Sequence, residues 1–347
     1  MDDVKLCVQW RFSCGPKHMR ILVLLAALLG GAPSFAADPC DTQVPHAFVE
    51  LSDVRLAYQS VGRDSDPALL LVMGLGGQLI HWPDAVVRRL CEDGFRVIRF
   101  DNRDAGLSTW NGRPAELNLR YQVLRHRLGL PVNAPYRLRD MALDSLGLMD
   151  ALGIERFHLL GVSMGGMIAQ HIADMQPQRV TSLTLVMTSS GAAGLPAPSD
   201  ALLRLLAERE APTRAEALQQ QVELLAALGS RRVSDDRDLL LQQAEEAYAR
   251  SFNPDGVQRQ LAAILAEPSR VELLARIEVP TLVVHGTDDP LLPVMHGVHV
   301  AAHIRGADLR LIPGLAHRFQ DAFREPLLQA VLPYLASHRD DEGLASL

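Results

Sequence analysis

The stretch Gly161-Val162-Ser163-Met164-Gly165-Gly166 decides the fold of this chain. It matches the pattern G-x-S-x-G, directly after an apolar run at Phe157–Leu160 and at the start of a helical pattern over Met164–Gln176. A strand, this motif and then a helix form the context in which the serine occupies a strained turn. The positions two before and two after the serine come into close contact there, so they must be very small. The sequence therefore predicts that the Ser163 hydroxyl stands clear of a sheet as a candidate nucleophile.

Apolar runs and helical patterns alternate along the chain on both sides of this motif, with Ser52-Asp53 expected as a hairpin turn. The expected strands are Ala47–Leu51, Val54–Tyr58, Ala68–Val72, Phe95–Phe100, Phe157–Leu160, Leu183–Met187, Thr281–His285 and Leu309–Ile312. The expected helices are Trp82–Asp93, Arg139–Leu152, Met164–Gln176 and Phe319–Ala336. This alternation predicts an α/β fold with a mostly parallel sheet covered by helices on both faces.

One long interval carries no strand signal. From about Ala197 to Ile277 the chain shows only Ala-, Leu- and Glu-rich helical periodicity, which predicts a helical insertion over the open edge of the sheet. The expected organisation is a signal and upstream extension (1–36), a first core part (46–190), a helical cap (191–277), a second core part (278–337) and a tail (338–347).

A serine hydroxyl needs a base to become a good nucleophile. His317 follows the last expected strand, and the chain order Ser, Asp, His predicts the base at this place. His296, His299 and His303 also lie downstream, but their spacing favours one face of a short helix without the carboxylate or cysteine that would complete a metal site. His285 ends a strand and is expected to pack or to anchor a loop.

The base in turn needs a carboxylate that holds its tautomer. Asp288 and Asp289 both follow the strand Thr281–His285, at the carboxyl end where sites of such sheets lie. Asp289 is the expected acid, and Asp288 is the alternative, with capping of the turn as its other role. The preceding expected strand is Leu183–Met187, and the loop after it, Thr188-Ser189-Ser190-Gly191, holds no carboxylate.

A tetrahedral intermediate needs N–H donors for its oxyanion. The expected donors are the backbone N–H groups of Met164, next after the serine, and Leu75, in the loop Met73-Gly74-Leu75-Gly76-Gly77. This loop lacks the G-x-G-x-x-G spacing of a dinucleotide site, and no cofactor or metal is expected.

Taken together, these residues resemble the α/β-hydrolase superfamily over about Phe48 to Leu335. Met73-Gly74-Leu75-Gly76 and Asp101-Asn-Arg103-Asp104-Ala-Gly106-Leu-Ser108 are similar to the aclacinomycin methylesterase-like carboxylic ester hydrolases. The resemblance implies an eight-stranded sheet, a helical cap and the triad Ser163, Asp289 and His317. Many members have His-Gly in place of Met73-Gly74 and Gly in place of Asp104. The resemblance leaves Asp101 and Arg103 as braces of the loops.

The expected activity is hydrolysis of a small or medium carboxylic ester through an acyl-enzyme. The same triad also serves C–C or amide hydrolysis and cofactor-free perhydrolysis, and a non-catalytic ligand-binding protein on this fold is an alternative of another class. The expected partner is a small-molecule ester. With a net charge of −7 and no Lys/Arg block, the chain is not expected to bind nucleic acid.

The N-terminus has the features of an export signal. Arg20 precedes the apolar run Ile21–Leu29, Gly30-Gly31-Ala-Pro33 interrupts it, and Ser34-Phe35-Ala36 offers a cleavage site. The expected product is periplasmic or secreted, without stable membrane insertion after cleavage. Cys40 and Cys91 would remain in it, and the sequence leaves open whether they pair.

Overall fold

The computed structural model describes residues 38–112, 117–207 and 213–339, and the expected signal at 1–36 lies outside this part of the chain. The strands are β1 (Ala47–Glu50), β2 (Val54–Val61), β3 (Ala68–Val72), β4 (Arg96–Phe100), β5 (Thr109–Trp110), β6 (Phe157–Val162), β7 (Val180–Val186), β8 (Thr281–Gly286) and β9 (Asp308–Ile312). The longer helices are α1 (Asp84–Glu92), α2 (Leu119–Arg127), α3 (Leu138–Ala151), α4 (Met164–Met175), α5 (Asp200–Ala207), α6 (Arg214–Leu228), α7 (Arg237–Arg250), α8 (Pro254–Leu265), α10 (Met295–His303) and α11 (Arg324–Ser337). The short ones are α9 (Val271–Leu274) and the 3₁₀ turns η1 (Leu79–His81), η2 (Pro177–Arg179) and η3 (Asp321–Phe323).

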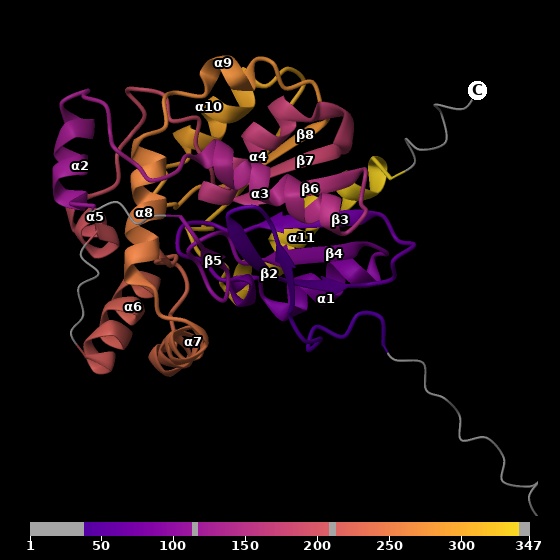
Figure 1. The fold of residues 1–347 in the computed structure, drawn as a ribbon, viewed down its shortest axis with the longest axis horizontal. Coiled ribbons are helices and arrows are strands. Elements are labelled where there is room, and N and C mark those ends of the chain that lie inside the picture. The colour runs from indigo at the N-terminus through magenta and orange to yellow at the C-terminus, as the bar shows by residue number, and fades with distance from the viewer. Residues whose placement is uncertain (1–37, 113–116, 208–212, 340–347) are drawn as a thin grey trace, which may run out of the picture. The chain divides into compact units, whose positions relative to one another are not determined.

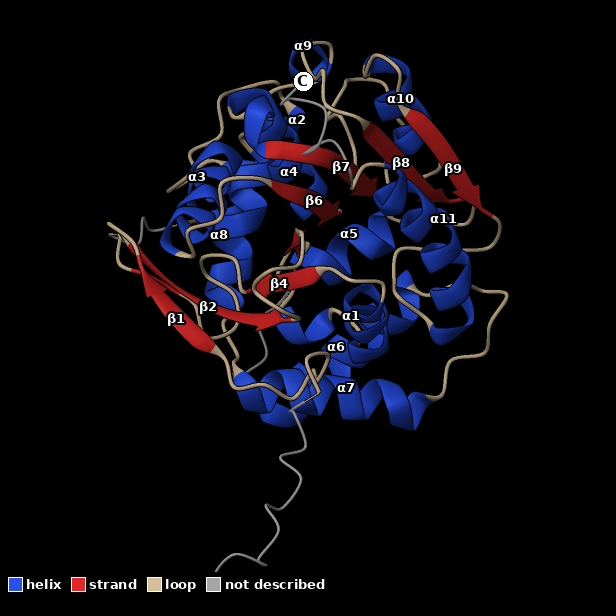
Figure 2. Ribbon diagram, turned by 90° about the vertical axis from the view of Figure 1, so that its right-hand side faces the viewer, coloured by secondary structure: helices blue, strands red, loops and turns tan. Residues whose placement is uncertain are grey.

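The strands form one sheet in the order β1-β2-β4-β3-β6-β7-β8-β9, with β5 paired to β2 (Figures 1 and 2). β1 and β2 are antiparallel, β2 and β4 are antiparallel, and all pairs from β4 to β9 are parallel. The predicted mostly parallel sheet of eight principal strands is therefore confirmed. The hairpin turn at Ser52-Asp53 joins β1 to β2, where the Leu51 N–H donates to the Val54 carbonyl at 2.8 Å.

Helices cover both faces of the sheet because successive strand residues point to opposite sides. In β3, Leu70 and Val72 pack in one core cluster with α3 and α4, whereas Leu69 and Leu71 pack in a second cluster with α1 and α11. All four side chains are fully buried, which explains the continuous apolar run that marked this strand in the sequence. The helices α5 to α9 all lie between β7 and β8 in the chain.

The boundaries differ from the sequence predictions at a few places. The helix expected over Phe319–Ala336 begins only at Arg324, after the η3 turn, so that Pro326 falls in its first turn, where a missing N–H costs nothing. The sequence prediction also missed β5 and α2. α2 carries a readable start signal, since the Asn118 side chain accepts a hydrogen bond from the Tyr121 N–H at 3.0 Å.

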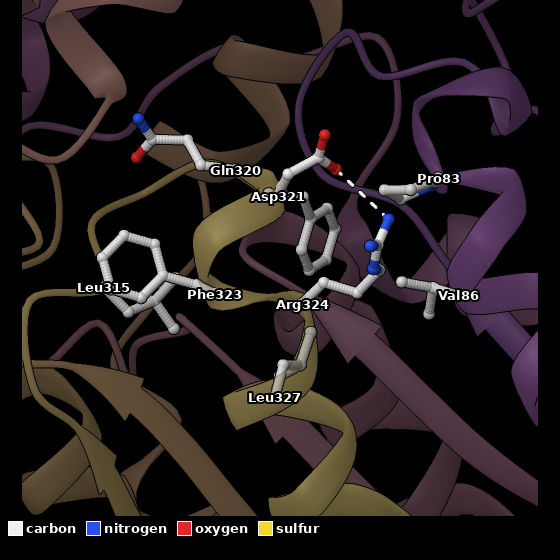
Figure 3. A pocket seen from close by; sticks show the side chains of 9 residues that line it. Pro83, Val86, Leu315, Gln320, Asp321, Phe323, Arg324 and Leu327 are labelled. Atoms are coloured by element: carbon white, nitrogen blue, oxygen red, sulfur yellow. Dashed lines mark hydrogen bonds and ion pairs between the residues drawn. The ribbon is translucent and has the colours of Figure 1, made fainter. Parts of the chain in front are cut away.

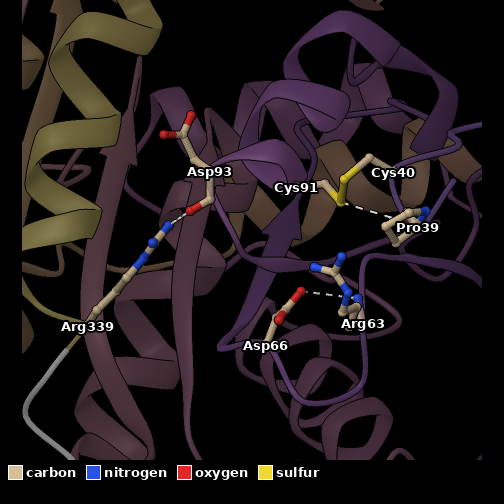
Figure 4. Close-up of a disulfide and its surroundings, with 7 residues drawn as sticks. All are labelled: Pro39, Cys40, Arg63, Asp66, Cys91, Asp93 and Arg339. Atoms are coloured by element: carbon tan, nitrogen blue, oxygen red, sulfur yellow. Dashed lines mark hydrogen bonds between the residues drawn. A yellow bond between two sulfur atoms is a disulfide. The ribbon is translucent and has the colours of Figure 1, made fainter.

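The beginning of the described chain is tied to the core by a disulfide between Cys40 and Cys91, whose Cα atoms lie 5.5 Å apart (Figure 4). Cys91 belongs to α1, and both cysteines are buried in the core cluster beneath α1 and α11. The backbone reinforces the link, because the Gly62 N–H donates to the Pro39 carbonyl at 2.9 Å.

No helix in the described ranges is both long enough and apolar enough to cross a bilayer.

Candidate active site

Ser163 lies at the turn between β6 and α4, as the motif predicts. Its backbone has φ 56° and ψ −119°, a conformation that L-residues rarely adopt. The turn is held from two sides: the Ser163 N–H donates to the Val186 carbonyl at 2.9 Å, and the Thr188 hydroxyl donates to the Ser163 carbonyl at 2.7 Å. The strain is thus maintained by the neighbouring strand β7 and the residues after it.

The small neighbours of Ser163 are required by contact with backbone. A Cβ on Gly161 would lie 2.3 Å from the Gly165 carbonyl oxygen, and a Cβ on Gly165 would lie 2.0 Å from the Val72 carbonyl oxygen. Both distances are far below any real carbon–oxygen contact. The spacing of the motif is therefore a direct consequence of how closely β6, β3 and α4 approach one another.

His317 reaches Ser163 from the loop after β9. Its Nε2 lies 2.9 Å from the Ser163 Oγ, and its Nδ1 lies 2.7 Å from the Asp289 Oδ2. A carboxylate only accepts hydrogen bonds, so Nδ1 carries the proton and Nε2 is free to accept the serine hydroxyl. This is the geometry in which an imidazole takes a proton from a nucleophile while an acid holds its tautomer.

Asp289 is buried, and its second carboxylate oxygen accepts the N–H groups of Leu291 at 2.9 Å and Leu292 at 2.7 Å. Burial disfavours its charge, but the charge and hydrogen bond of His317 and the Leu292 N–H outweigh burial and lower the pKa of Asp289. The carboxylate therefore stays ionised beside His317. Asp288 faces elsewhere: it accepts from Arg232 Nε at 2.6 Å and from the Thr287 hydroxyl at 2.7 Å.

The other candidate histidines lie apart from Ser163. His296 places Nδ1 2.8 Å from the Ser189 Oγ and Nε2 2.9 Å from the Pro196 carbonyl oxygen, so both ring nitrogens are occupied. His299 bonds to the Ser190 hydroxyl at 3.0 Å, and its ring stacks on that of His303 with centroids 4.0 Å apart. His296 and His299 thus tie α10 to the segment after β7, and His303 packs on His299 within the helix.

His285, which the sequence predicts to pack or to anchor a loop, is also a neighbour of the acid. Its Nε2 donates to the Leu292 carbonyl at 2.7 Å and lies 3.5 Å from the Asp289 Oδ2. Burial is the largest cause of its lowered pKa, so the ring stays neutral. His285 anchors the loop as expected and also fixes the carbonyl of the residue that donates to Asp289.

The loop expected to carry an oxyanion donor lies against the nucleophile. A Cβ on Gly74 would come within 3.1 Å of the Ser163 Cβ, so the loop and the serine are in contact. Met164 is the first residue of α4, and its N–H has no acceptor within the helix. Leu75 is the first corner of a turn that closes with a 3.0 Å bond from the Gly77 N–H to the Gly74 carbonyl. Both expected donors thus flank Ser163.

The charged motif Asp101–Ser108 does not reach Ser163 but binds helices. Asp101 pairs with Arg250 of α7 at 2.7 Å, Arg103 pairs with Asp144 of α3 at 2.5 Å, and Asp104 pairs with Arg259 of α8 at 2.7 Å. Asp101 and Arg103 brace the loops, and so does Asp104, at a position where many members of the family named above have Gly.

A small hollow lies behind the loop of His317, between α1 and the start of α11 (Figure 3). Pro83 and Val86 line it from one side, and Leu315, Phe323 and Leu327 line it from the other. Neither Ser163 nor His317 lines this hollow, so it is not the substrate side of the site.

Residues 67–328 match the family model described as the alpha/beta hydrolase fold. The chain belongs to this family. Among similar α/β hydrolases, rhodomycin D methylesterase DauP from a Streptomyces species is 29% identical over 311 residues, covering 83% of this chain and 97% of that protein. A putative carbamate hydrolase RutD from Variovorax paradoxus is 30% identical over 272 residues, covering 77% of this chain and 91% of that one.

A solved structure with the same α/β-hydrolase fold is that of a hydrolase from Pseudomonas aeruginosa. It is 29% identical, covers 84% of this chain and 98% of that one, and has a TM-score of 0.66. The family and these relatives support an esterase-type hydrolase.

Proposed function

We propose that this α/β hydrolase cleaves small or medium carboxylic esters through a covalent acyl-enzyme formed on Ser163. The observation that carries the proposal is the continuous chain of bonds from the Ser163 hydroxyl through His317 to Asp289, at 2.9 Å and 2.7 Å. His296 and His299, the other candidate bases, bond to Ser189, Pro196 and Ser190 instead of to Ser163. Relatives named methylesterases agree with an ester as substrate.

In this mechanism the Ser163 Oγ attacks the ester carbonyl while His317 Nε2 takes its proton. The N–H groups of Leu75 and Met164 stabilise the oxyanion of the tetrahedral intermediate. His317 then gives its proton to the departing alkoxide, which leaves as an alcohol. Water, deprotonated by His317, attacks the acyl-enzyme and releases the acid together with free Ser163. Asp289 stabilises the imidazolium that forms in each half of the cycle.

The proposal is tested with p-nitrophenyl esters of graded acyl length. Rapid mixing is expected to show a burst of p-nitrophenol close to one equivalent of enzyme wherever deacylation is slower than acylation. A wild-type protein that turns over none of the esters would refute the esterase proposal and favour a non-catalytic binding protein. Ser163→Ala is the control, because it removes the nucleophile and leaves the ester pocket intact.

Carbamate hydrolysis is a second candidate, since several relatives of 28–30% identity carry the name of putative carbamate hydrolase. The same triad serves both bonds, because each reaction passes through a tetrahedral oxyanion. Parallel assays of kcat/KM on an ester and on a matched p-nitrophenyl carbamate distinguish them. We propose the ester as the better substrate, and a higher kcat/KM for the carbamate would reverse that order.

We also propose that the protein acts in the periplasm or outside the cell. The apolar run at Ile21–Leu29 and the small residues before Ala37 support this, and so does the Cys40–Cys91 disulfide, which persists best in an oxidising compartment. N-terminal sequencing of the protein from a periplasmic extract is expected to begin near Ala37. An uncut chain recovered from the cytosol would contradict the proposal.

A further inference from the structure

Helix α8 packs against the turn that carries Leu75. Residues Gly74 to Gly77 form a β-turn with Leu75 and Gly76 at its corners, and Gly76 has φ +64°. The N–H of Gly76 belongs to the central peptide of this turn, a group that a β-turn leaves without a partner of its own. Here it donates to the Gln260 Oε1 at 2.8 Å.

Gln260 is fully buried in the middle of α8 and uses both ends of its amide. Its Nε2 donates to the Arg103 carbonyl at 2.7 Å, on the loop after β4. This second bond fixes which end of the amide faces Gly76, because only the oxygen can accept the Gly76 N–H. The side chain therefore bridges two loops at the carboxyl edge of the sheet and has no freedom to turn.

The helix itself is held over the turn by other contacts. Arg259, the preceding residue, forms a two-bond ion pair with Asp104 at 2.7 and 2.8 Å. Val257 lies over the turn so tightly that a Cβ on Gly76 would come within 2.9 Å of its Cγ2. The position of the central peptide is thus set by α8, a helix that contributes no member of the triad.

We propose that Gln260 is a positioning residue for the oxyanion site: its bond to the Gly76 N–H fixes the turn so that the Leu75 N–H points to the developing oxyanion. This inference rests on the proposed function. The Leu75 N–H belongs to the peptide before the central one, and the two peptides share the Leu75 Cα. If the central peptide is free to shift relative to the loop after β4, that shift therefore also moves the Leu75 N–H. A bond to the central peptide removes the freedom before substrate arrives, which is what preorganisation of an oxyanion site requires.

The prediction separates transition-state stabilisation from substrate binding. Gln260→Leu removes both hydrogen bonds of the side-chain amide. It is expected to lower kcat by about 10- to 100-fold, with KM changed by less than about threefold, because a small misplacement of the Leu75 N–H acts on the transition state. The affinity for a trifluoromethyl ketone, whose tetrahedral adduct carries an oxyanion, should fall by a factor similar to that for kcat/KM.

A conservative variant adds a measurement, the pH dependence of kcat, that would not change if the role of Gln260 were only structural. Gln260→Glu keeps an acceptor for the Gly76 N–H, but it donates to the Arg103 carbonyl only when protonated. Its kcat relative to the wild type at the same pH is therefore expected to rise as the pH falls from about 8 to about 6, because burial raises the pKa of a carboxyl group.

Gln122→Leu is the matched control. Gln122 is also a buried glutamine that accepts a backbone N–H, from Asn133 at 2.9 Å, but it lies in α2 away from the turn. The variant Gln122→Leu is expected to lower the melting temperature and to leave kcat within about twofold of the wild type. The inference is overturned if Gln260→Leu keeps the wild-type kcat, if its loss lies in KM alone, or if Gln122→Leu loses the same factor. Lack of activity in the wild type would instead refute the proposed function.

Discussion

The carboxylates of Asp288 and Asp289 are neighbours in the chain but serve different partners. Asp289 is buried and bonds to His317 Nδ1 at 2.7 Å, whereas Asp288 is half-buried and pairs with the exposed Arg232 at 2.6 Å. The chain turns at Thr287 and Asp288, so the two neighbouring carboxylates leave it in different directions. One residue of register thus decides which carboxylate reaches the imidazole.

The two carboxylates should respond differently to the same substitution. Asp289→Asn is expected to lower kcat for ester hydrolysis by about 10⁴, since an amide at this place favours the wrong tautomer of the base. Asp288→Asn loses only an exposed ion pair and is expected to stay within about threefold. Steady-state assays of both variants decide this, and a larger loss in Asp288→Asn would reverse the assignment.

The disulfide should contribute strongly to stability because it closes a long loop. Its cysteines are 51 residues apart, and a loop of that length corresponds to about 4 kcal/mol of chain entropy in the unfolded state. Cys91→Ala is expected to lower the free energy of unfolding by about this amount in urea. The double variant Cys40→Ala/Cys91→Ala should lose no more than the single one. A loss below about 1 kcal/mol would show that the bond contributes little.

Removing one partner of the ion pair between Asp104 and Arg259 should lower the free energy of unfolding. Asp104→Gly avoids the strain of a side chain at φ 67° but leaves the Arg259 guanidinium and the Tyr136 hydroxyl without their acceptor. The expected loss is about 3–5 kcal/mol of unfolding free energy. Arg259→Met combined with Asp104→Gly should recover part of it, and a loss that is simply additive would argue against the pair.

His158 should make stability depend on pH. Burial, with added repulsion from His338 and two arginines, lowers the pKa of His158 to about 4, while an unfolded histidine titrates near 6.5. The unfolded chain therefore takes up a proton first as the pH falls, and the folded state loses stability between about pH 6.5 and pH 4. His158→Leu is expected to reduce this loss by about 2–3 kcal/mol. Denaturation curves of the wild type and His158→Leu at several pH values measure this difference. The same loss of stability with pH in both proteins would refute the prediction.

The elements that position the site were largely predictable, for local physical reasons. The strands β3, β6 and β8 are buried on both faces and therefore read as continuous apolar runs. Gly161 is required by contact with the Gly165 backbone in the same motif, and Gly165 by contact with the Val72 carbonyl of the neighbouring strand β3. The expected order of serine, acid and histidine placed all three side chains in loops that follow strands, where the parallel sheet brings them to one edge.

The parts that escaped prediction depend on contacts between distant segments. Gln260 reaches Gly76 across 184 residues, and nothing in its own neighbourhood distinguishes it from other helical glutamines. β5 has only two residues, too short for any periodicity to show. The pairing of Cys40 with Cys91 required the distance between their backbones, which sequence spacing does not give.

The most direct test of the account is covalent labelling of Ser163. A fluorophosphonate probe reacts rapidly only with a serine that a base activates. Mass mapping of the labelled wild-type protein is expected to find the adduct on Ser163 alone, at one per chain, with no labelling in Ser163→Ala and a loss of at least about 10³-fold in rate in His317→Ala. Stoichiometric labelling at another serine, or an unchanged rate in His317→Ala, would contradict the claim that His317 activates Ser163.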